Sequence, residues 1–261
     1  MLLDRFRVTD KVAIVTGAGR GIGAGAALGL AEAGAHVVCA ARTREQIDDV
    51  AAQVRDRGRR AIAVECDVNV RADLERVAAR TMEEFGRVDI LVNNAGGWPP
   101  QPALETSEET FAGAFHFNVT TAFLLTRFVV PHMLARGGGA VVNISSGAGR
   151  YAIPGFVAYG TAKAALSFMT RILGQEFAPR VRVNAIAVGA VETSALAPFL
   201  DAELRAKMEA LTPMRRIGTV EDIAAAVVYL ASPAAGWVTG MVFEIDGGSE
   251  TSNWPFPPPQ L

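Results

Sequence analysis

Short apolar segments alternate with segments of helical periodicity along the chain, and this alternation limits the possible folds more than any other feature. The apolar segments are almost continuously hydrophobic, as expected for strands of a parallel sheet covered on both faces. Strands are predicted at Val12–Thr16, His36–Ala41, Ala61–Cys66, Val88–Asn93, Ala140–Ser145, Val181–Val188 and Val242–Ile245. Helices are predicted between them, among them Arg44–Arg57, Ala72–Phe85, Glu108–Leu134, Tyr159–Phe177 and Val220–Ala231. No linker interrupts this pattern, so residues 1–261 are predicted to form a single doubly wound α/β domain.

The first predicted strand leads into a glycine-rich turn, Thr16-Gly-Ala-Gly-Arg-Gly-Ile-Gly23, which opens a helix. Glycine lets the backbone turn tightly and lets a pyrophosphate approach the free N–H groups at a helix N-terminus. Such glycines also allow a helix to pack closely on a strand. Because this turn follows a strand and opens a helix, we interpret it as a dinucleotide site. The expected contacts are Gly17, Gly21, Ile22 and Gly23.

The end of the second predicted strand bears on the kind of dinucleotide. An NAD site usually places an acidic residue there, which binds the ribose 2′-hydroxyl. This strand ends in Ala41 and is followed by Arg42 and Thr43, while Arg20 lies in the glycine turn. A guanidinium offers forked donors and a permanent charge to a 2′-phosphate. The pattern favours NADP(H) and leaves NAD(H) possible; the alternative is that both arginines are solvated loop residues.

Polar side chains follow the third and fourth predicted strands, where open α/β sheets bind ligands. Asp67 and Val68 come after the third strand, and Asn93-Asn-Ala-Gly96 follows the fourth. Asn94, Ala95 and Gly96 are therefore expected to contact the dinucleotide. Taken alone, the same four residues are typical of a turn or a helix cap.

A candidate catalytic group follows the fifth strand. Tyr159 and Lys163 are four residues apart on a predicted helix and so share one face, while Ser146 ends the strand before them. A serine at the end of a strand and a tyrosine at the start of a helix are placed to face one cleft. Taken alone, a Tyr/Lys pair at this spacing is usually a surface or packing pair.

As a set, these motifs make the chain similar to the short-chain dehydrogenase/reductase family. The resemblance covers roughly Asp10 to Ser249 and includes Asn118 besides the residues above. It implies a Rossmann-like domain with the strand order 3-2-1-4-5-6-7, and usually a homotetramer. Within the family the chain resembles bacterial hydroxysteroid dehydrogenases and 3-oxoacyl-carrier-protein reductases.

The resemblance also implies roles for the catalytic residues. Tyr159 donates a proton to the carbonyl oxygen, or removes one from the alcohol, and Ser146 hydrogen-bonds the same oxygen. Lys163 and the positive charge of oxidised nicotinamide are both expected to lower the pKa of Tyr159, because a nearby cation favours the phenolate. Asn118 holds a water that links Lys163 to solvent; without the resemblance it is a polar residue that interrupts a helix. Tyr159 and Lys163 also contact the dinucleotide.

After the sixth strand the family usually has Pro-Gly, whereas this chain has Val188-Gly189. Proline fixes φ, so its replacement predicts a looser segment around the nicotinamide amide. Gly189, Val191 and Thr193 still match the pattern and are expected to bind the cofactor.

The substrate side is predicted from apolar loops. Trp98, Tyr151 and Leu196 are its expected walls, and the stretch from Ser194 to Met214 is either a lid or ordinary packing. Few charges project from these loops, which favours a lipophilic, steroid-like secondary alcohol or ketone as the small-molecule substrate. The alternatives are reduction of 3-oxoacyl thioesters on a carrier protein that docks on Arg136, Arg180 and Arg182, and a non-catalytic dinucleotide-sensing protein. The complete set of catalytic residues disfavours the latter.

Composition excludes other classes. The 25 basic and 27 acidic residues give a net charge of −2, so no nucleic-acid partner is expected. Cys39 and Cys66 lie in apolar strands, and the three histidines lack metal-ligand spacing, which predicts a reducing compartment and no metal. Without a signal peptide or a run of about 18 apolar residues, the protein is expected to be cytoplasmic and not in a membrane. The proline-rich tail, residues 250–261 with Trp254 and Phe256, is predicted to be extended, and either disordered or packed across a neighbouring subunit.

Overall fold

The computed structural model describes residues 1–193, 196–197, 200–253 and 255, and the described strands form one parallel sheet. The strands are β1 (Val12–Thr16), β2 (His36–Ala41), β3 (Ala61–Glu65), β4 (Ile90–Asn93), β5 (Gly139–Ser146), β6 (Val181–Val188) and β7 (Val242–Ile245). Their order in this seven-stranded sheet is β3-β2-β1-β4-β5-β6-β7. The predicted fold class and strand order are confirmed.

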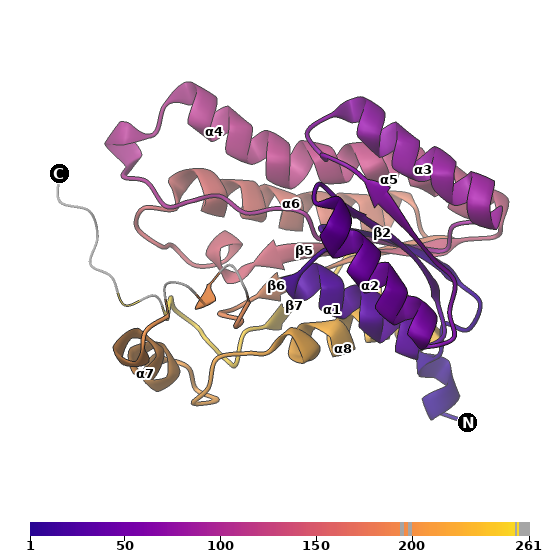
Figure 1. Ribbon diagram of the computed structural model, residues 1–261. Helices are drawn as coiled ribbons and strands as arrows, with labels where there is room; N and C mark the ends of the chain where they lie inside the picture. Colours follow the sequence, from indigo (N-terminus) through magenta and orange to yellow (C-terminus); the bar gives the residue numbers. More distant parts are fainter. Residues whose placement is uncertain (194–195, 198–199, 254, 256–261) are drawn as a thin grey trace.

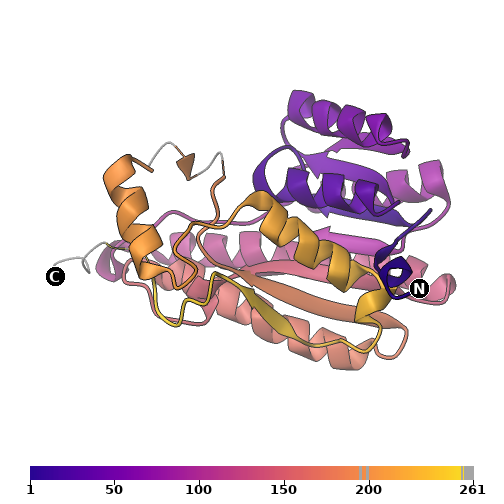
Figure 2. The same ribbon diagram turned by 90° about the horizontal axis from the view of Figure 1, so that it is seen from below.

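Helices cover both faces of the sheet, as Figures 1 and 2 show. One face carries α1 (Gly21–Glu32), α2 (Arg44–Asp56) and α8 (Val220–Ala231), and the other carries α3 (Arg71–Phe85), α5 (Thr121–Ala135) and α6 (Val157–Glu176). Successive strand residues point to opposite faces, so Val15 packs into the first layer and Ile14 into the second. Because all strands run parallel, their carboxyl ends meet at one edge, where Thr16 and Ser146 lie.

The predicted helix from Glu108 to Leu134 is interrupted in the structure. It consists of α4 (Glu108–Phe115), a π-helical turn η3 (His116–Thr120) and α5. A π turn is wider than an α turn and frequently marks a functional site. This one contains Asn118, whose Nδ2 donates to Ala114 O over 2.9 Å. Hydrophobic periodicity extends through the turn, which is why the sequence predicted a single helix.

The region predicted as a lid contains a helix, α7 (Ala202–Leu211), in which Met208 is buried. Asp201 caps its N-terminus by accepting a hydrogen bond from Leu204 N over 2.7 Å. Nearby, Ser249 and Asn253 at the start of the C-terminal tail are buried. Trp254 and Phe256, on which the prediction for the tail rested, lie outside the described residues.

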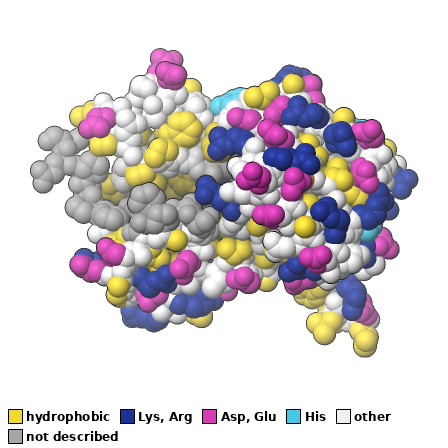
Figure 3. Space-filling model, in the orientation of Figure 1, with side chains coloured by type: hydrophobic (Ala, Val, Ile, Leu, Met, Phe, Trp, Pro, Cys, Tyr) yellow, Lys and Arg dark blue, Asp and Glu magenta, His cyan; other side chains and the backbone are white. Residues whose placement is uncertain are grey.

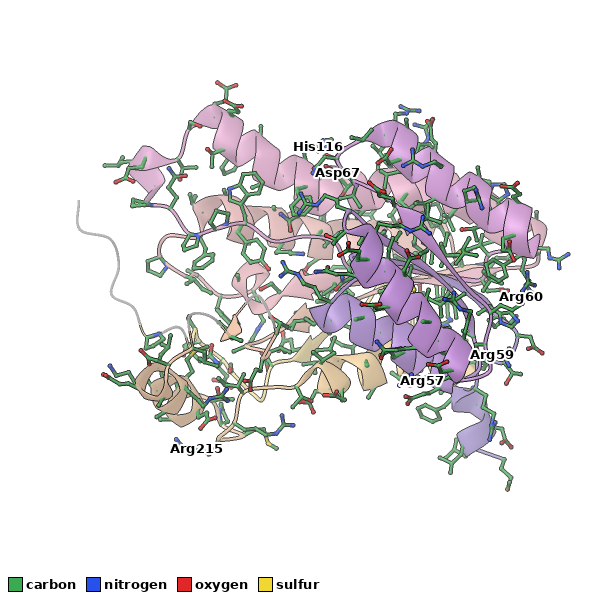
Figure 4. The ribbon with its side chains drawn as sticks, viewed as in Figure 1. Arg57, Arg59, Arg60, Asp67, His116 and Arg215 are labelled. Carbon is green, nitrogen blue, oxygen red and sulfur yellow. The ribbon has the colours of Figure 1, made fainter. Side chains whose placement is uncertain are left out.

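Charged and apolar side chains are distributed unevenly over the surface. On the face seen in Figure 3, acidic and basic side chains alternate over the side of α2 and α3, and hydrophobic ones gather between α4 and α7. Figure 4 shows Arg60 and Asp67 at opposite ends of β3. Arg60 and the neighbouring Arg57 and Arg59 therefore lie away from the carboxyl edge of the sheet. None of the helices in the described ranges is long and apolar enough to span a membrane.

Candidate active site

A cavity of about 580 Å³ opens at the carboxyl edge of the sheet. It collects every residue that the sequence predicted for the dinucleotide, together with Ser146. These are Gly17, Arg20, Gly21, Ile22, Gly23, Arg42, Thr43, Asp67, Val68, Asn94, Ala95, Gly96, Tyr159, Lys163, Gly189, Val191 and Thr193. Residues more than 170 positions apart in the chain therefore line one space. No group of three or more potential metal ligands occurs among the described residues.

The glycine turn requires glycine both for its backbone conformation and for its close internal contacts. A Cβ on Gly23 would lie 2.2 Å from Gly17 O, and Gly17 and Gly21 have φ values of +64° and +53°. Other residue types rarely adopt such conformations. The turn ends at Gly21, where α1 begins with its N–H groups directed at the cavity edge. This cradle fits the pyrophosphate of a dinucleotide.

Two arginines make part of the cavity lining basic. They are Arg20 and Arg42, and in the described part of the chain neither guanidinium has an ion-pair partner. Asp67 is the sole carboxylate among the described residues that line the cavity. β2 ends at Ala41, so no acidic side chain occupies the position next to Arg42. The donor set fits a phosphate group.

Thr16 and Asn94 join the glycine turn to the end of β4. Thr16 Oγ1 accepts the N–H groups of Asn94 and Ala95 over 3.0 and 3.1 Å. Asn94 Nδ2 in turn donates to Thr16 O over 2.9 Å. These bonds fix the floor of the cavity. The amide of Asn94 thus holds the turn in place, in keeping with its proximity to Gly17 and Gly23.

Ser146, Tyr159 and Lys163 meet where the cavity approaches the centre of the carboxyl edge. Ser146 and Tyr159 line the same part of the cavity, close enough for the serine hydroxyl to lower the pKa of the phenol. Lys163 Nζ lies 5.7 Å from the centroid of the Tyr159 ring and donates to Ile144 O over 2.8 Å. α6 begins at Val157, two residues earlier than predicted, which places both Tyr159 and Lys163 in its first two turns.

Burial dominates the protonation of this group. It raises the pKa of the Tyr159 phenol, and the Ser146 hydroxyl acts in the opposite direction. Burial lowers the pKa of Lys163 from 10.5 to about 7. In this structure burial thus outweighs any lowering of the Tyr159 pKa, and the lowering that we expected from Lys163 and oxidised nicotinamide together stays a prediction for the cofactor-bound protein. Burial has this effect because the low-polarity site disfavours the charged forms of both groups.

Asn118 does not line the cavity but lies directly behind it. Its Oδ1 accepts Gly97 N over 2.9 Å, and its Nδ2 donates to Gly97 O over 3.1 Å. A Cβ on Gly96 would lie 2.8 Å from Asn118 Oδ1 and 3.0 Å from Lys163 Nζ. Asn118 and Lys163 therefore flank the same glycine, and the π turn brings the asparagine to this position.

Ser145 and Ser146 point in different directions, as strand geometry requires. Ser145 Oγ donates to Lys163 O over 3.0 Å and lies 2.8 Å from Ser167 Oγ. It therefore faces α6, whereas Ser146 faces the cavity. This agrees with the choice of Ser146 over Ser145 from the sequence.

The segment after β6 is firmly held at its start. Gly189 N donates to Ile245 O over 3.1 Å, and a Cβ on Gly189 would lie 2.6 Å from Asp246 Cα. Val188 pairs with Ser146 and Ile245 as the last residue of β6. These contacts hold Val188 and Gly189, whereas the looser segment that we expected from the missing proline stays a prediction, since the chain beyond Thr193 is only partly described.

The three predicted substrate residues lie outside the cavity. Trp98 packs against Gly113 of α4, where an added Cβ would lie 3.0 Å from the indole. Tyr151 lies over Gly147, next to Ser146. Leu196 is described and partly buried, but two residues on each side of the pair 196–197 lie outside the described part of the chain.

The cavity also includes residues that the sequence analysis missed. Gln46 lies beside the glycine turn, where a Cβ on Gly19 would be 2.9 Å from Gln46 Cβ. Phe117, Ile144 and Cys66 contribute further wall. The position of Gln46, four residues after Arg42 at the start of a helix, was an available signal. The other three are apolar residues next to predicted site positions, and nothing in their type marked them.

The comparisons with known proteins agree with this geometry. A family model described as "Enoyl-(Acyl carrier protein) reductase" matches residues 17–250. An uncharacterised oxidoreductase of Mycobacterium tuberculosis is 52% identical over 263 residues, covering 100% of each chain. The 7alpha-hydroxysteroid dehydrogenase of Escherichia coli is 38% identical over 246 residues, covering 94% of this chain and 96% of that protein. A solved structure of 7 alpha-hydroxysteroid dehydrogenase complexed with NADH and 7-oxo glycochenodeoxycholic acid superposes with a TM-score of 0.91 at 38% identity, covering 95% of this chain and 97% of that one.

The fold and the site define an NAD(P)-dependent oxidoreductase that acts on CH–OH groups. The strand order, the glycine turn and the Ser–Tyr–Lys group occur here in one chain that matches such enzymes over nearly its whole length. The chain belongs to the short-chain dehydrogenase/reductase family.

Proposed function

We propose that this protein transfers a hydride between NADP(H) and a lipophilic secondary alcohol or ketone, with Ser146, Tyr159 and Lys163 as its catalytic residues. The observation that carries the proposal is that Ser146, Tyr159 and Lys163 line the dinucleotide cavity together, with Lys163 buried and its Nζ 5.7 Å from the centroid of the Tyr159 ring. The nicotinamide supplies or accepts the hydride when it is bound.

The protein side chains handle the proton and the developing charge. Tyr159 donates its proton to the carbonyl oxygen during reduction, and its raised pKa keeps the phenol protonated at neutral pH. Ser146 hydrogen-bonds the same oxygen, where negative charge develops. Lys163 binds the ribose and supplies a positive charge beneath the phenol in its protonated form. Asn118 orders the backbone around Gly97 and holds the water that links Lys163 to solvent.

The preference for NADP(H) rests on the two arginines without partners. Arg20 and Arg42 line the same cavity from two different elements, the turn before α1 and the segment after β2. A 2′-phosphate between them forms charge-assisted hydrogen bonds that a 2′-hydroxyl does not. The NADH in the related 7 alpha-hydroxysteroid dehydrogenase structure makes NAD(H) the alternative that has to be tested.

The proposed substrate class rests on the apolar surface beside the catalytic group. Tyr151 lies over Gly147 beside Ser146, Trp98 packs on α4, and hydrophobic side chains gather between α4 and α7 in Figure 3. The relatives named for hydroxysteroids support a ring-shaped secondary alcohol or ketone. We therefore expect cyclic and steroid-like ketones to be better substrates than short linear ones.

A second candidate is reduction of carrier-bound 3-oxoacyl thioesters. Arg136, Arg180 and Arg182 do come together, around a cavity of about 510 Å³. That cavity lies at the amino edge of the sheet, beside Ile90 and Ala140, the opposite edge to Ser146 in the same chain. We rank this function second because, within one chain, the three arginines and the catalytic residues lie at opposite edges of the sheet. A carrier protein docked on those arginines would not face the catalytic residues of the same chain.

A titration with NADPH and NADH, followed by nicotinamide fluorescence, tests the cofactor proposal. We expect Arg42→Ala to weaken NADPH binding by about tenfold or more and to leave NADH binding nearly unchanged. Arg127→Ala, an exposed arginine on α5, is the matched control. Tight NADH binding that Arg42→Ala does not change would overturn the NADP(H) preference.

Replacement of the phenol tests the catalytic proposal. Tyr159→Phe removes the proton and keeps the ring, so we expect NADPH binding to persist and ketone reduction to fall by about 10²- to 10⁴-fold. Turnover at the wild-type rate in this variant would rule out the proton-transfer role.

A further inference from the structure

Arg150 joins the loop after β5 to the end of β7, which lies more than ninety positions away in the chain. Its Nε is 3.2 Å from Glu244 Oε1, and its Nη2 is 3.3 Å from Asp246 Oδ2. The same Nη2 donates to Ser249 O. A guanidinium with several fixed acceptors sets orientation as well as distance. The junction thus holds two segments in one relative position.

The segment that Arg150 binds also supports the dinucleotide cavity. Asp246 is almost fully buried, and its Oδ1 accepts the N–H groups of Gly248 and Ser249 over 3.0 and 3.3 Å. Its backbone lies against Gly189, where an added Cβ would be 2.6 Å from Asp246 Cα. The position of Asp246 therefore limits the position of Gly189.

The same segment is attached to α7. Met214 N donates to Gly247 O over 3.1 Å, and Asn253 Nδ2 donates to Thr212 Oγ1 over 3.0 Å. Thr212 and Asn253 are both buried. Residues 246–253 thus connect Arg150 with the C-terminal end of α7, the helix that lies within the predicted lid.

On its own side, Arg150 fixes the turn that begins at Ser146. Gly147 O accepts the N–H groups of Arg150 and Tyr151 over 2.8 and 3.0 Å. The Arg150 guanidinium lies 5.2 Å from the centroid of the Tyr151 ring, and that ring covers Gly147. Any movement of Arg150 therefore moves Tyr151 and the backbone next to Ser146.

We propose that Arg150 is a positioning residue, which holds the Ser146–Tyr151 turn, the Gly189 segment and the end of α7 in the arrangement that binds the substrate. The proposal rests on the ketone and alcohol chemistry proposed above. Arg150 acts through Tyr151 and the C-terminal segment and does not touch the reacting atoms. Its effect is on substrate recognition, since the part of the cavity lined by Arg20 and Arg42 belongs to other elements.

Kinetics of Arg150→Ala, Arg150→Lys and Arg127→Ala with NADPH and cyclic ketones of increasing size test this role. We expect Arg150→Ala to raise KM for the ketone by about tenfold, because three charge-assisted contacts are lost. NADPH affinity and kcat should fall by no more than about twofold to threefold, because Arg150 reaches Gly189 and Ser146 only indirectly, through Asp246 and Tyr151. Arg150→Lys should recover part of the loss, since it keeps the charge but not the fork. Arg127→Ala should behave as the wild type.

An unchanged KM in Arg150→Ala overturns the proposal. So does a parallel loss of kcat, KM, NADPH binding and melting temperature, because that pattern is a general structural effect. Hydrogen exchange is measured on the NADPH-bound wild type and Arg150→Ala and needs no substrate. It therefore tests the positioning role even if the proposed function fails. We expect amide hydrogens in residues 147–156 and 201–214 to exchange faster in Arg150→Ala than in the wild type. Exchange in residues 17–43 should be the same in both proteins. If the wild type reduces no ketone, the proposed function fails, while the exchange pattern still supports or overturns the positioning role.

Discussion

Lys163 is an ammonium group placed where water hardly reaches, and this has a cost for the folded state. Lys163 is only 3% exposed, and burial lowers the pKa of its side chain from 10.5 to about 7. Between these two values the unfolded chain binds a proton that the folded protein does not. The destabilising contribution is therefore fully present below pH 7 and is removed as the pH rises towards 10.5.

From this sign we predict how stability depends on pH. In urea unfolding of the dinucleotide-free protein, the stability of the wild type should rise relative to Lys163→Met by about 1.4 kcal/mol per pH unit above pH 7. Lys207→Met removes an exposed lysine and serves as the control. Parallel pH profiles for the wild type and Lys163→Met would show that the ammonium is not desolvated as the structure indicates.

A second prediction concerns the glycine between Asn118 and Lys163. Gly96→Ala introduces a Cβ at 2.8 Å from Asn118 Oδ1 and 3.0 Å from Lys163 Nζ, closer than such atoms approach. One of the two side chains must move, so we expect turnover to fall by about tenfold or more. The measurement is kcat, with the melting temperature as the check that the protein remains folded. An alanine variant with the kcat of the wild type would indicate that neither side chain needs its present position.

At the level of the elements, β5 and α6 act together. β5 ends in Ser146, α6 begins near Tyr159, and buried polar side chains join the two. Asn143 on β5 donates to Thr170 Oγ1 on α6 over 2.9 Å and accepts from Asn93 Nδ2 over 2.9 Å. Ser145 binds the backbone of Lys163 in the same way. A fully satisfied buried network of this kind fixes the helix relative to the strand.

Removal of the central amide tests this coupling. Asn143→Ala leaves buried polar groups of Asn93 and Thr170 with fewer partners, so we expect a loss of about 2 kcal/mol or more in the free energy of unfolding. Gln175→Ala, an exposed glutamine on the same helix, should change it by less than about 0.5 kcal/mol. Denaturant unfolding of both variants gives the comparison. Equal stability of the two would contradict a structural role for the network.

The sequence predicted these elements well where local pattern decides the structure. The apolar strands, the glycine turn and the Tyr159–Lys163 spacing carry their own signals, so the strands and the lining of the dinucleotide cavity could be anticipated, whereas the sheet order followed from the family resemblance. The π turn at Asn118 could not be predicted, because its hydrophobic periodicity is that of a continuous helix. The role proposed for Arg150 depends on Glu244 and Asp246, partners that only the folded chain brings near. The fall in the pKa of Lys163 depends on burial, which spacing alone does not reveal.

At the level of the whole molecule, large apolar side chains remain exposed on one layer of helices. Phe168 and Ile172 on α6 are 65% and 49% exposed, and Phe111, Phe115 and Phe123 on α4 and α5 are about 40% exposed. Phe168 and Ile172 are four residues apart and so share a face. Exposed apolar surface of this kind typically marks an interface. It supports the prediction that copies of this chain associate.

We therefore predict that the protein is an oligomer, a homotetramer as the resemblance implies, held in part by α4, α5 and α6. The double variant Phe168→Glu/Ile172→Glu places two charges in that contact, and burial of unpaired charge is strongly unfavourable. Sedimentation or light scattering should show a smaller assembly for this variant than for the wild type. Arg127→Ala on α5 controls for a general effect of surface substitution. NADPH binding should survive in the dissociated variant, because the exposed side chains of Phe168 and Ile172 do not line the dinucleotide cavity. A monomeric wild type would contradict the prediction, because no second copy of the chain would then cover the exposed face.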